Sequence, residues 1–225
     1  MDVQMYWSHS FFADLIRPDG VVFDFGVNNG GFARLVAPSC RRVIGFEPDP
    51  TWGGRLSLPP NVLVVPKAVA SKSGTIPFHV NEGLCSSLHF AEAGTKTVEV
   101  EAVTLSDAMA IEPEGRIDLI KMDIEGEELA ILNSAPADLF TRVVQMTVEF
   151  HDFLDPASVP AIRAVIARME GMGFHAIRFS WNSYGDLLFI NQRLVPLTMR
   201  QRAWVRLRHK YVRGAVRVMR RMLIL

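Results

Sequence analysis

The chain has 225 residues, of which 49% are hydrophobic, and its 24 lysines and arginines balance its 24 aspartates and glutamates. This composition excludes a disordered chain, a collagen-like fibre and a disulfide-dense secreted module. The two cysteines, Cys40 and Cys85, are too few for a disulfide framework and have no paired metal-ligand spacing, so we expect a reducing compartment.

The first element expected is a helix over residues 1–18. Phe11, Phe12, Leu15 and Ile16 recur at helical spacing, and the Pro-Asp-Gly sequence that follows them ends a helix. This segment lacks the basic and apolar regions of a signal peptide. No stretch of the chain approaches the roughly 18 continuous apolar residues that span a bilayer. We therefore expect a cytoplasmic protein.

Short β-rich runs then alternate with helical stretches. Several runs are almost continuously apolar, as in parallel strands that are covered on both faces. The expected strands are 21–27, 42–46, 62–69, 117–124, 143–150, 176–179 and 187–191, and the expected helices are 31–37, 127–133 and 158–172. Extra strand material at 76–80 and 98–103 flanks a loop insertion. The alternation predicts a doubly wound α/β sheet, with its core over 20–192 in a domain of residues 1–198.

The tail, residues 199–225, is the only shift in composition. It contains nine basic and no acidic residues, which leaves 15 basic and 24 acidic residues in the body. Spacings of three, four and seven residues predict a basic amphipathic helix with an apolar stripe of Trp204, Leu207, Tyr211, Val218 and Met222. Such a helix fits an anionic membrane surface, here the inner face of the membrane, or packing on the body or on a second subunit. Nucleic-acid binding is a third and less favoured role for the tail, because the body is acidic.

A ligand site is predicted where the first strand meets the first helix. Gly26 and Gly30 permit a tight turn there, and the helix N-terminus offers free N–H groups. Glu47, 21 residues after Gly26, ends the second strand, where an acidic residue binds both ribose hydroxyls of a nucleoside. Asn28 replaces a glycine of the dinucleotide motif and Asp24 precedes the loop, which disfavours a pyrophosphate and favours an ammonium group. S-adenosylmethionine has these properties.

Five segments, in order, resemble the FkbM-type S-adenosylmethionine-dependent methyltransferases. They are 24–30, 45–50, 61–76, 117–132 and 143–151, and the Lys-x-Asp-x-Glu-Gly sequence that begins at Lys121 is the most specific. The resemblance implies a Rossmann-like class I methyltransferase sheet of seven mostly parallel strands, helices on both faces, and a reversed hairpin that supplies the last two strands. It also implies an O-methyltransferase that acts on a hydroxyl of a sugar, glycan or natural-product acceptor, with S-adenosylmethionine as donor.

The resemblance assigns residues to each part of the donor. Glu47 would bind the ribose, and Asp24 would fix the loop or the ammonium group, although it could be only a turn or capping residue. The residues expected at the methionine moiety are Gly26, Asn28 and Gly30, and those expected near the adenine are Pro48, Asp49, Ala68 and Val69. The alternative for Pro48 and Asp49 is a plain turn.

Four candidates for catalysis follow the fourth and fifth strands: Asp123, Glu125, Glu149 and His151. Methyl transfer from a sulfonium needs alignment of donor and acceptor and removal of the acceptor's proton. Asp123 and Glu125 alternate, so they share a face of an extended segment, where Asp123 could also contact the donor cation. Glu149 and His151 alternate in the same way, and His151 could be the general base. The structural alternative for Glu125 is a helix cap.

Two other functions remain open at this level, and no essential metal is expected. A binding or scaffold protein could keep the fold without turnover, since the general base is uncertain. Methylation of nucleic acid is less favoured. No His/Cys spacing indicates zinc, although clustered carboxylates are compatible with a metal-assisted transfer.

Overall fold

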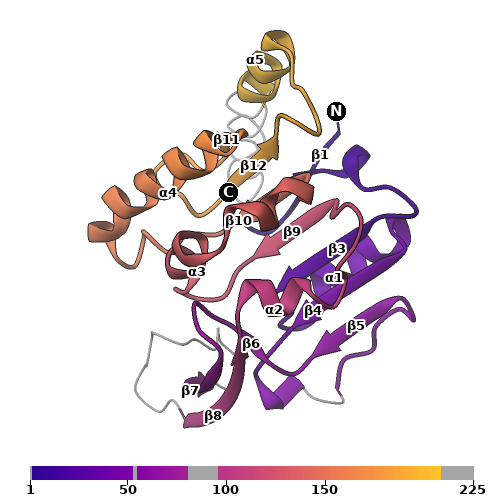
Figure 1. Cartoon of the computed structure of the whole chain (residues 1–225), viewed down its shortest axis with the longest axis vertical. Helices are drawn as coiled ribbons and strands as arrows, with labels where there is room; N and C mark the ends of the chain where they lie inside the picture. Colours follow the sequence, from indigo (N-terminus) through magenta and orange to yellow (C-terminus); the bar gives the residue numbers. More distant parts are fainter. Residues whose placement is uncertain (1, 53–54, 81–95, 209–225) are drawn as a thin grey trace, which may run out of the picture.

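The computed structural model describes residues 2–52, 55–80 and 96–208. Its centre is a seven-stranded sheet in the order β11-β12-β10-β9-β3-β4-β5, in which β12 runs opposite to the other six strands (Figure 1). The predicted seven-stranded, mostly parallel sheet with a final hairpin is therefore confirmed. The strands are β3 (Val21–Phe25), β4 (Arg42–Phe46), β5 (Val62–Val65), β9 (Leu119–Met122), β10 (Gln145–Val148), β11 (Phe174–Arg178) and β12 (Leu187–Asn191).

The two faces of this sheet are covered by different elements. Successive strand residues point to opposite faces, so Phe23 enters the core beneath α2, α3 and α4, while Val22 packs with Phe32 and Val36 of α1. The helices are α1 (Gly31–Val36), α2 (Leu105–Met109), α3 (Glu128–Ser134) and α4 (Val159–Gly171). Asp24 lies two residues after Val22 on the same strand, so its carboxylate points to the face covered by α1.

The N-terminal segment is a hairpin, so the helix expected over residues 1–18 is wrong. Strands β1 (Val3–Tyr6) and β2 (His9–Phe12) pair antiparallel, and a 3-10 turn (Ala13–Leu15) follows. Phe11 and Phe12 enter different cores, Phe11 beside α1 and Phe12 beside strand β12. The Gln145 amide accepts from Phe12 N–H and donates to Phe12 C=O, both at 2.9 Å. Burial against distant strands therefore outweighs the local helical spacing.

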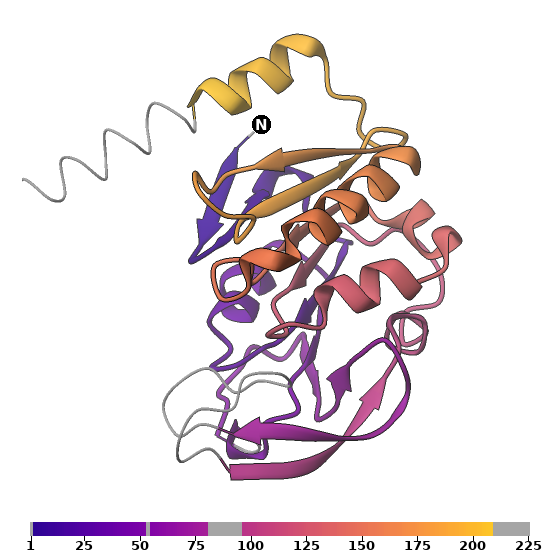
Figure 2. The same cartoon turned by 90° about the vertical axis from the view of Figure 1, so that its left-hand side faces the viewer.

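A smaller sheet lies at the end of the molecule opposite the N-terminal hairpin (Figures 1 and 2). Its order is β6-β8-β7, with β6 (Ala68–Val69), β7 (Gly74–Val80) and β8 (Lys96–Val103). The expected strand 62–69 is thus divided between the two sheets. Strand material was predicted at β7 and β8, while the loop insertion 81–94 lies outside the described residues.

Helix α5 (Met199–Arg208) begins the basic tail and lies at the same end as the N-terminus (Figure 2). Val205 is buried with Phe12 and Leu197, whereas Trp204 is 60% exposed. The Arg202 guanidinium donates to Gln192 Oε1 at 2.6 Å and to Leu197 C=O at 3.1 Å. The remainder of the expected helix, 209–225, lies outside the described residues. No helix of the described part is long and apolar enough to cross a membrane.

Candidate active site

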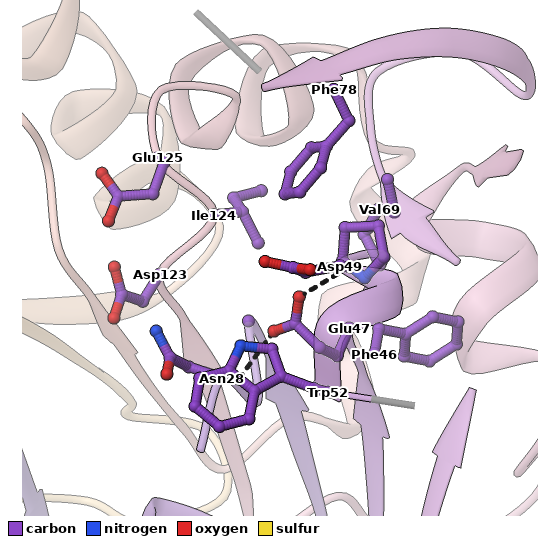
Figure 3. Close-up of a pocket in the computed structure, with 13 residues that line it drawn as sticks. Asn28, Phe46, Glu47, Asp49, Trp52, Val69, Phe78, Asp123, Ile124 and Glu125 are labelled. Atoms are coloured by element: carbon purple, nitrogen blue, oxygen red, sulfur yellow. Dashed lines mark hydrogen bonds between the residues drawn. The ribbon is translucent and has the colours of Figure 1, made fainter. Parts of the chain in front are cut away.

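A cavity opens at the carboxyl ends of β3, β4 and β9 (Figure 3). Its volume is about 660 Å³, including its opening to solvent. Its lining is formed by Gly26, Asn28, Phe46, Glu47, Pro48, Asp49, Trp52, Ala68, Val69, Phe78, Asp123, Ile124 and Glu125. The structure thus brings together the residues predicted for the donor, except Asp24 and Gly30.

Glu47 shapes the loop that follows β3. Its Oε2 accepts from Asn28 N–H at 2.6 Å, and its Oε1 accepts from Asp49 N–H at 2.9 Å. Asn28 adopts a left-handed backbone, with φ of 49°, which is uncommon for a residue other than glycine. Burial raises the pKa of Glu47 to about 7. Each carboxylate oxygen has a second lone pair, so Glu47 can also accept hydrogen bonds from a ligand.

Apolar rings complete the wall around Glu47. Trp52, in the 3-10 turn Pro50–Trp52, and Phe78 of β7 lie on two sides of the Glu47 carboxylate in Figure 3. Sequence reasoning missed both residues, although each lies close to a predicted feature, the second strand end and the extra strand material. Together with Val69 and Ile124 they form a surface suited to a flat aromatic group.

Asp24 lies beneath the cavity, where it pairs with Lys121. The two residues are in register on β3 and β9, with Lys121 Nζ 3.3 Å from Asp24 Oδ1 and 3.4 Å from Asp123 Oδ2. Burial raises the pKa of Asp24 to about 6, whereas for Lys121 the carboxylates outweigh burial and raise its pKa to about 12. Lys121 also donates to Gly26 C=O at 2.6 Å. Asp24 is therefore placed to fix the loop through Lys121.

Gly26 and Gly30 allow the chain to pack closely in this loop. Gly26 has φ of 86°, and a Cβ there would lie 1.9 Å from Asp123 C=O. Gly30 has φ of 78°, and its Cβ would meet the Leu58 side chain at 2.6 Å. The glycine at 26 thus serves the contact between the loop and the end of β9, and it also lines the cavity.

A cluster of ionisable side chains adjoins the cavity at Asp123. His9 Nε2 lies 3.2 Å from Asp123 Oδ2 and 3.7 Å from Glu149 Oε2, and the Ser8 hydroxyl donates to the same Glu149 oxygen. Sequence reasoning gave His9 no role, because its position depends on the hairpin. His9 is 1% exposed, and burial lowers its pKa, so the ring is neutral near pH 7.

The carboxylates of this cluster differ in their affinity for protons. Burial favours protonation of Asp123, but Lys121 and His9 outweigh it and hold its pKa well below the usual range. Burial and the nearby charge of Asp123 raise the pKa of Glu149 to about 7. Groups with such different pKa values in one cleft are typical of acid–base catalysis, in which Glu149 is the group able to exchange a proton near neutrality.

His151 forms ion pairs with Glu125 and Glu128 and also lies 3.9 Å from Asp123, so it joins the same cluster. Its Nε2 lies 3.1 Å from Glu125 Oε2, and its Nδ1 lies 3.4 Å from Glu128 Oε1. Burial lowers the pKa of His151, but the two carboxylates outweigh it and raise it to about 11. The imidazolium does not suit a general base at neutral pH. Glu128, and not Glu125, accepts from the N–H groups of Ile124 and Gly126 ahead of α3.

Two sets of three residues in the described chain bring possible metal donors within 4.8 Å: His9, Asp123 and Glu149, and Asp123, Glu125 and His151. In the first set, Lys121 already pairs with the Asp123 oxygen that faces His9. In the second set, His151 already pairs with Glu125 and Glu128. We therefore interpret both sets as hydrogen-bonded ion-pair networks.

The sequence profile of the methyltransferase FkbM domain matches residues 24–176, well over half of the chain. This chain belongs to the methyltransferase FkbM domain family. The resemblance seen in the sequence is thereby confirmed. Among curated proteins, no sequence matches this chain. The FkbM match begins at Asp24 and ends within β11, so it includes neither the N-terminal hairpin nor β12 and α5.

Several solved methyltransferase structures are similar to this FkbM-family chain. An rRNA methylase from Streptococcus thermophilus has a TM-score of 0.45 and 11% identity, and covers 79% of this chain and 88% of its own. A putative methyltransferase from Streptococcus mutans in complex with SAH has a TM-score of 0.41 and 9% identity, with the same coverage. The N-methyltransferase NodS from Bradyrhizobium japonicum has a TM-score of 0.42 and 12% identity, covering 79% and 90%. These likenesses concern the fold alone.

Proposed function

We propose that the protein is an S-adenosylmethionine-dependent O-methyltransferase that acts on a hydroxyl of a sugar, glycan or natural-product acceptor. The observation that carries this proposal is one cavity with Glu47 among apolar walls on one side and the Asp123 cluster on the other. Membership of a methyltransferase family supports the reaction class. The proposed acceptor and the proposed donor each rest on separate features of the site.

The lining of the cavity fits S-adenosylmethionine, which supplies a methyl group on a sulfonium. Glu47 would accept hydrogen bonds from the ribose hydroxyls, and Trp52 and Phe78 would pack on the adenine. The carboxylates of Asp123 and Glu125 line the same space and complement a sulfonium and an ammonium group. The negative charge of the site is thus placed for a cationic ligand without phosphate groups.

A hydroxyl acceptor suits the residues beside the cavity. Its oxygen must lose a proton as the methyl group is transferred, and a base works best when its pKa lies near the working pH. Glu149 has a pKa of about 7 and adjoins Asp123 through His9. We therefore propose Glu149 as the general base, and Asp123 and Glu125 as residues that orient the donor and the acceptor.

Transfer of a tritiated methyl group would test this function. Extracts of glycans, hydroxylated metabolites and RNA from cells that lack the protein are incubated with purified protein and labelled S-adenosylmethionine. We expect label in a base-stable methyl ether of a glycan or metabolite. Glu149→Gln should lower transfer about 10²- to 10⁴-fold, the range for loss of a general base, whereas Glu170→Gln, exposed on α4, should not change it.

Two outcomes of this experiment would contradict the proposal. Label confined to RNA would favour the nucleic-acid alternative. Binding of S-adenosylmethionine without transfer to any of the three extracts would favour the scaffold alternative.

The basic tail leads to a further proposal about where the enzyme acts. An anionic surface at the inner face of a membrane would attract its arginines by about 1 kcal/mol for each basic residue near the surface. Replacement of Arg213, Arg217, Arg220 and Arg221 by glutamine in the full chain should therefore abolish flotation with phosphatidylserine vesicles. Phosphatidylcholine vesicles are the neutral control. Equal flotation of both proteins, or of neither, would contradict membrane binding and leave packing on the body or on a second subunit.

A further inference from the structure

The N-terminal hairpin lies outside the family match at 24–176 but reaches the ionisable cluster. Its Ser8 hydroxyl donates to Glu149 Oε2, and its His9 Nε2 lies within 3.2 Å of Asp123 and 3.7 Å of Glu149. We propose that the hairpin is part of the active site, with Ser8 and His9 as positioning residues that hold Glu149 in place as the base for the acceptor. This inference rests on the proposed methyl transfer.

Strand alternation directs the cluster toward the hairpin. Lys121 and Asp123 are two residues apart along β9 and its end, and Thr147 and Glu149 are two residues apart along β10 and its end. Side chains at this spacing point to the same face of a sheet. Because Thr147 pairs with Lys121, all four share one face, which β2 covers. His9 lies over Thr147, whose Oγ1 is 3.4 Å from His9 Nδ1. The two ring nitrogens are therefore turned in opposite directions, one toward the sheet and one toward the carboxylates.

The register of the hairpin on the sheet is held by residues on either side of His9. Ser10 donates to Asp186 from its N–H at 2.9 Å and from its hydroxyl at 2.8 Å. The Gln145 side-chain amide hydrogen-bonds both the N–H and the C=O of Phe12. A slip of one residue would turn His9 away from the cluster, so these contacts fix which side chains reach Glu149.

The tip of the hairpin has an unusual backbone. Trp7 and Ser8 form the two-residue turn between Tyr6 and His9, and Trp7 has φ of 51° with its side chain 81% exposed. In the described chain the other non-glycine residues with left-handed φ are Asn28 and Glu125, and both line the cavity. Backbone strain of this kind gathers at functional sites, where the surrounding structure enforces it. At the tip, it accompanies the turn that directs Ser8 to Glu149.

The charges that face Glu149 show what the hairpin contributes. Asp123 and Glu125 oppose its ionisation and raise its pKa, whereas the Ser8 hydrogen bond and the charge of His151 lower it. His9 faces Glu149 as a neutral ring and donates toward Asp123. A hydrogen bond to a carboxylate favours its charged form. Loss of the Ser8 hydroxyl therefore leaves Glu149 protonated to a higher pH.

The test follows Glu149 directly by carbon-13 NMR of glutamate-labelled protein, with the resonance assigned through Glu149→Gln. We expect Ser8→Ala to raise the titration midpoint of Glu149 by about one pH unit, and to move the acid limb of the pH–rate profile upward equally. Ser8→Thr keeps the hydroxyl and should retain the midpoint of the unmodified protein. Ser73→Ala is the matched control, because it removes a serine hydroxyl that donates to a carboxylate outside the cluster, that of Asp107.

The outcomes separate this inference from the proposed function. An unshifted midpoint in Ser8→Ala, or an equal shift in Ser73→Ala, would overturn the role of the hairpin while methyl transfer by the unmodified protein stood. A shifted midpoint with an unchanged pH–rate profile would also overturn it. Failure of the proposed function appears instead as absence of transfer in the unmodified protein, and the NMR titration still reports whether Ser8 controls Glu149.

Discussion

Replacement of Glu47 by alanine is expected to abolish measurable binding of S-adenosylmethionine. The two ribose hydroxyls would lose the carboxylate as their hydrogen-bond acceptor. Hydrogen bonds to charged groups are worth about 1.5–3 kcal/mol each. The N–H groups of Asn28 and Asp49 would also lose their acceptor, which loosens the loop. Affinity should therefore fall roughly 10²- to 10⁴-fold. Isothermal titration calorimetry measures this loss, and Glu170→Ala on α4 serves as the surface control.

The pH dependence of nucleoside binding isolates the Glu47 carboxylate. The probe is 5′-methylthioadenosine, which has the ribose but lacks the amino acid, so its own charge is constant near neutrality. Hydroxyl donors prefer the ionised acceptor, and the pKa of Glu47 is about 7. Affinity should thus rise about tenfold from pH 6 to pH 8, as the ionised fraction rises from about one tenth to about nine tenths. Equal pH dependence in Glu47→Gln would contradict the assignment.

Replacement of Lys121 by methionine is expected to destabilise the fold by about 3–5 kcal/mol, the usual result of removing one member of a buried ion pair. Asp24 would remain buried without its counter-ion, and Gly26 C=O would lose its donor. Urea unfolding measures the free energy. Lys67→Met is the control, since Lys67 pairs with Glu101 at the surface and should cost less than about 1 kcal/mol.

A double-mutant cycle and a change of pH sharpen this second prediction. Asp24→Asn combined with Lys121→Met should recover part of the lost stability, because no buried charge is then left unpaired. The pKa of Asp24 is raised to about 6, so its contribution to stability is present below its unfolded value and is lost as the pH rises through 6. Without Lys121 this pKa rises further, and the variant should lose more stability at pH 8 than at pH 5. Equal costs for the Lys121 and Lys67 variants would contradict the role of the pair.

The central sheet and the donor side of the cavity could be predicted from sequence because their signals are local. Buried parallel strands are recognisable as apolar runs such as 42–46. The sequence spacing from Gly26 to Glu47 predicts that both lie at the same edge of the sheet, since each follows the end of a parallel strand. The structure therefore gathers most of the predicted residues around one cavity, while their binding of the donor remains a proposal.

The acceptor side was harder to predict because it depends on contacts between distant parts of the chain. Phe11 and Phe12 fit a helix by spacing, and only their burial in two different cores, Phe11 beside α1 and Phe12 beside β10 and β12, decides for a strand. The role of His9 depends on that strand and its register. Likewise, His151 looks like a base in isolation, and its charge follows from Glu125 and Glu128 in three dimensions.

The position of the hairpin also has a consequence for how the catalytic unit is defined. A recombinant fragment cut at the borders of the homologous region, 24–176, would lack both Ser8 and the strand that covers Thr147 and Gln145. It would also lack β12, whose hydrogen bonds join β10 to β11. Such a fragment would expose apolar sheet surface and an open strand edge, both of which favour aggregation. The smallest unit expected to fold is thus larger than the region that the family profile matches.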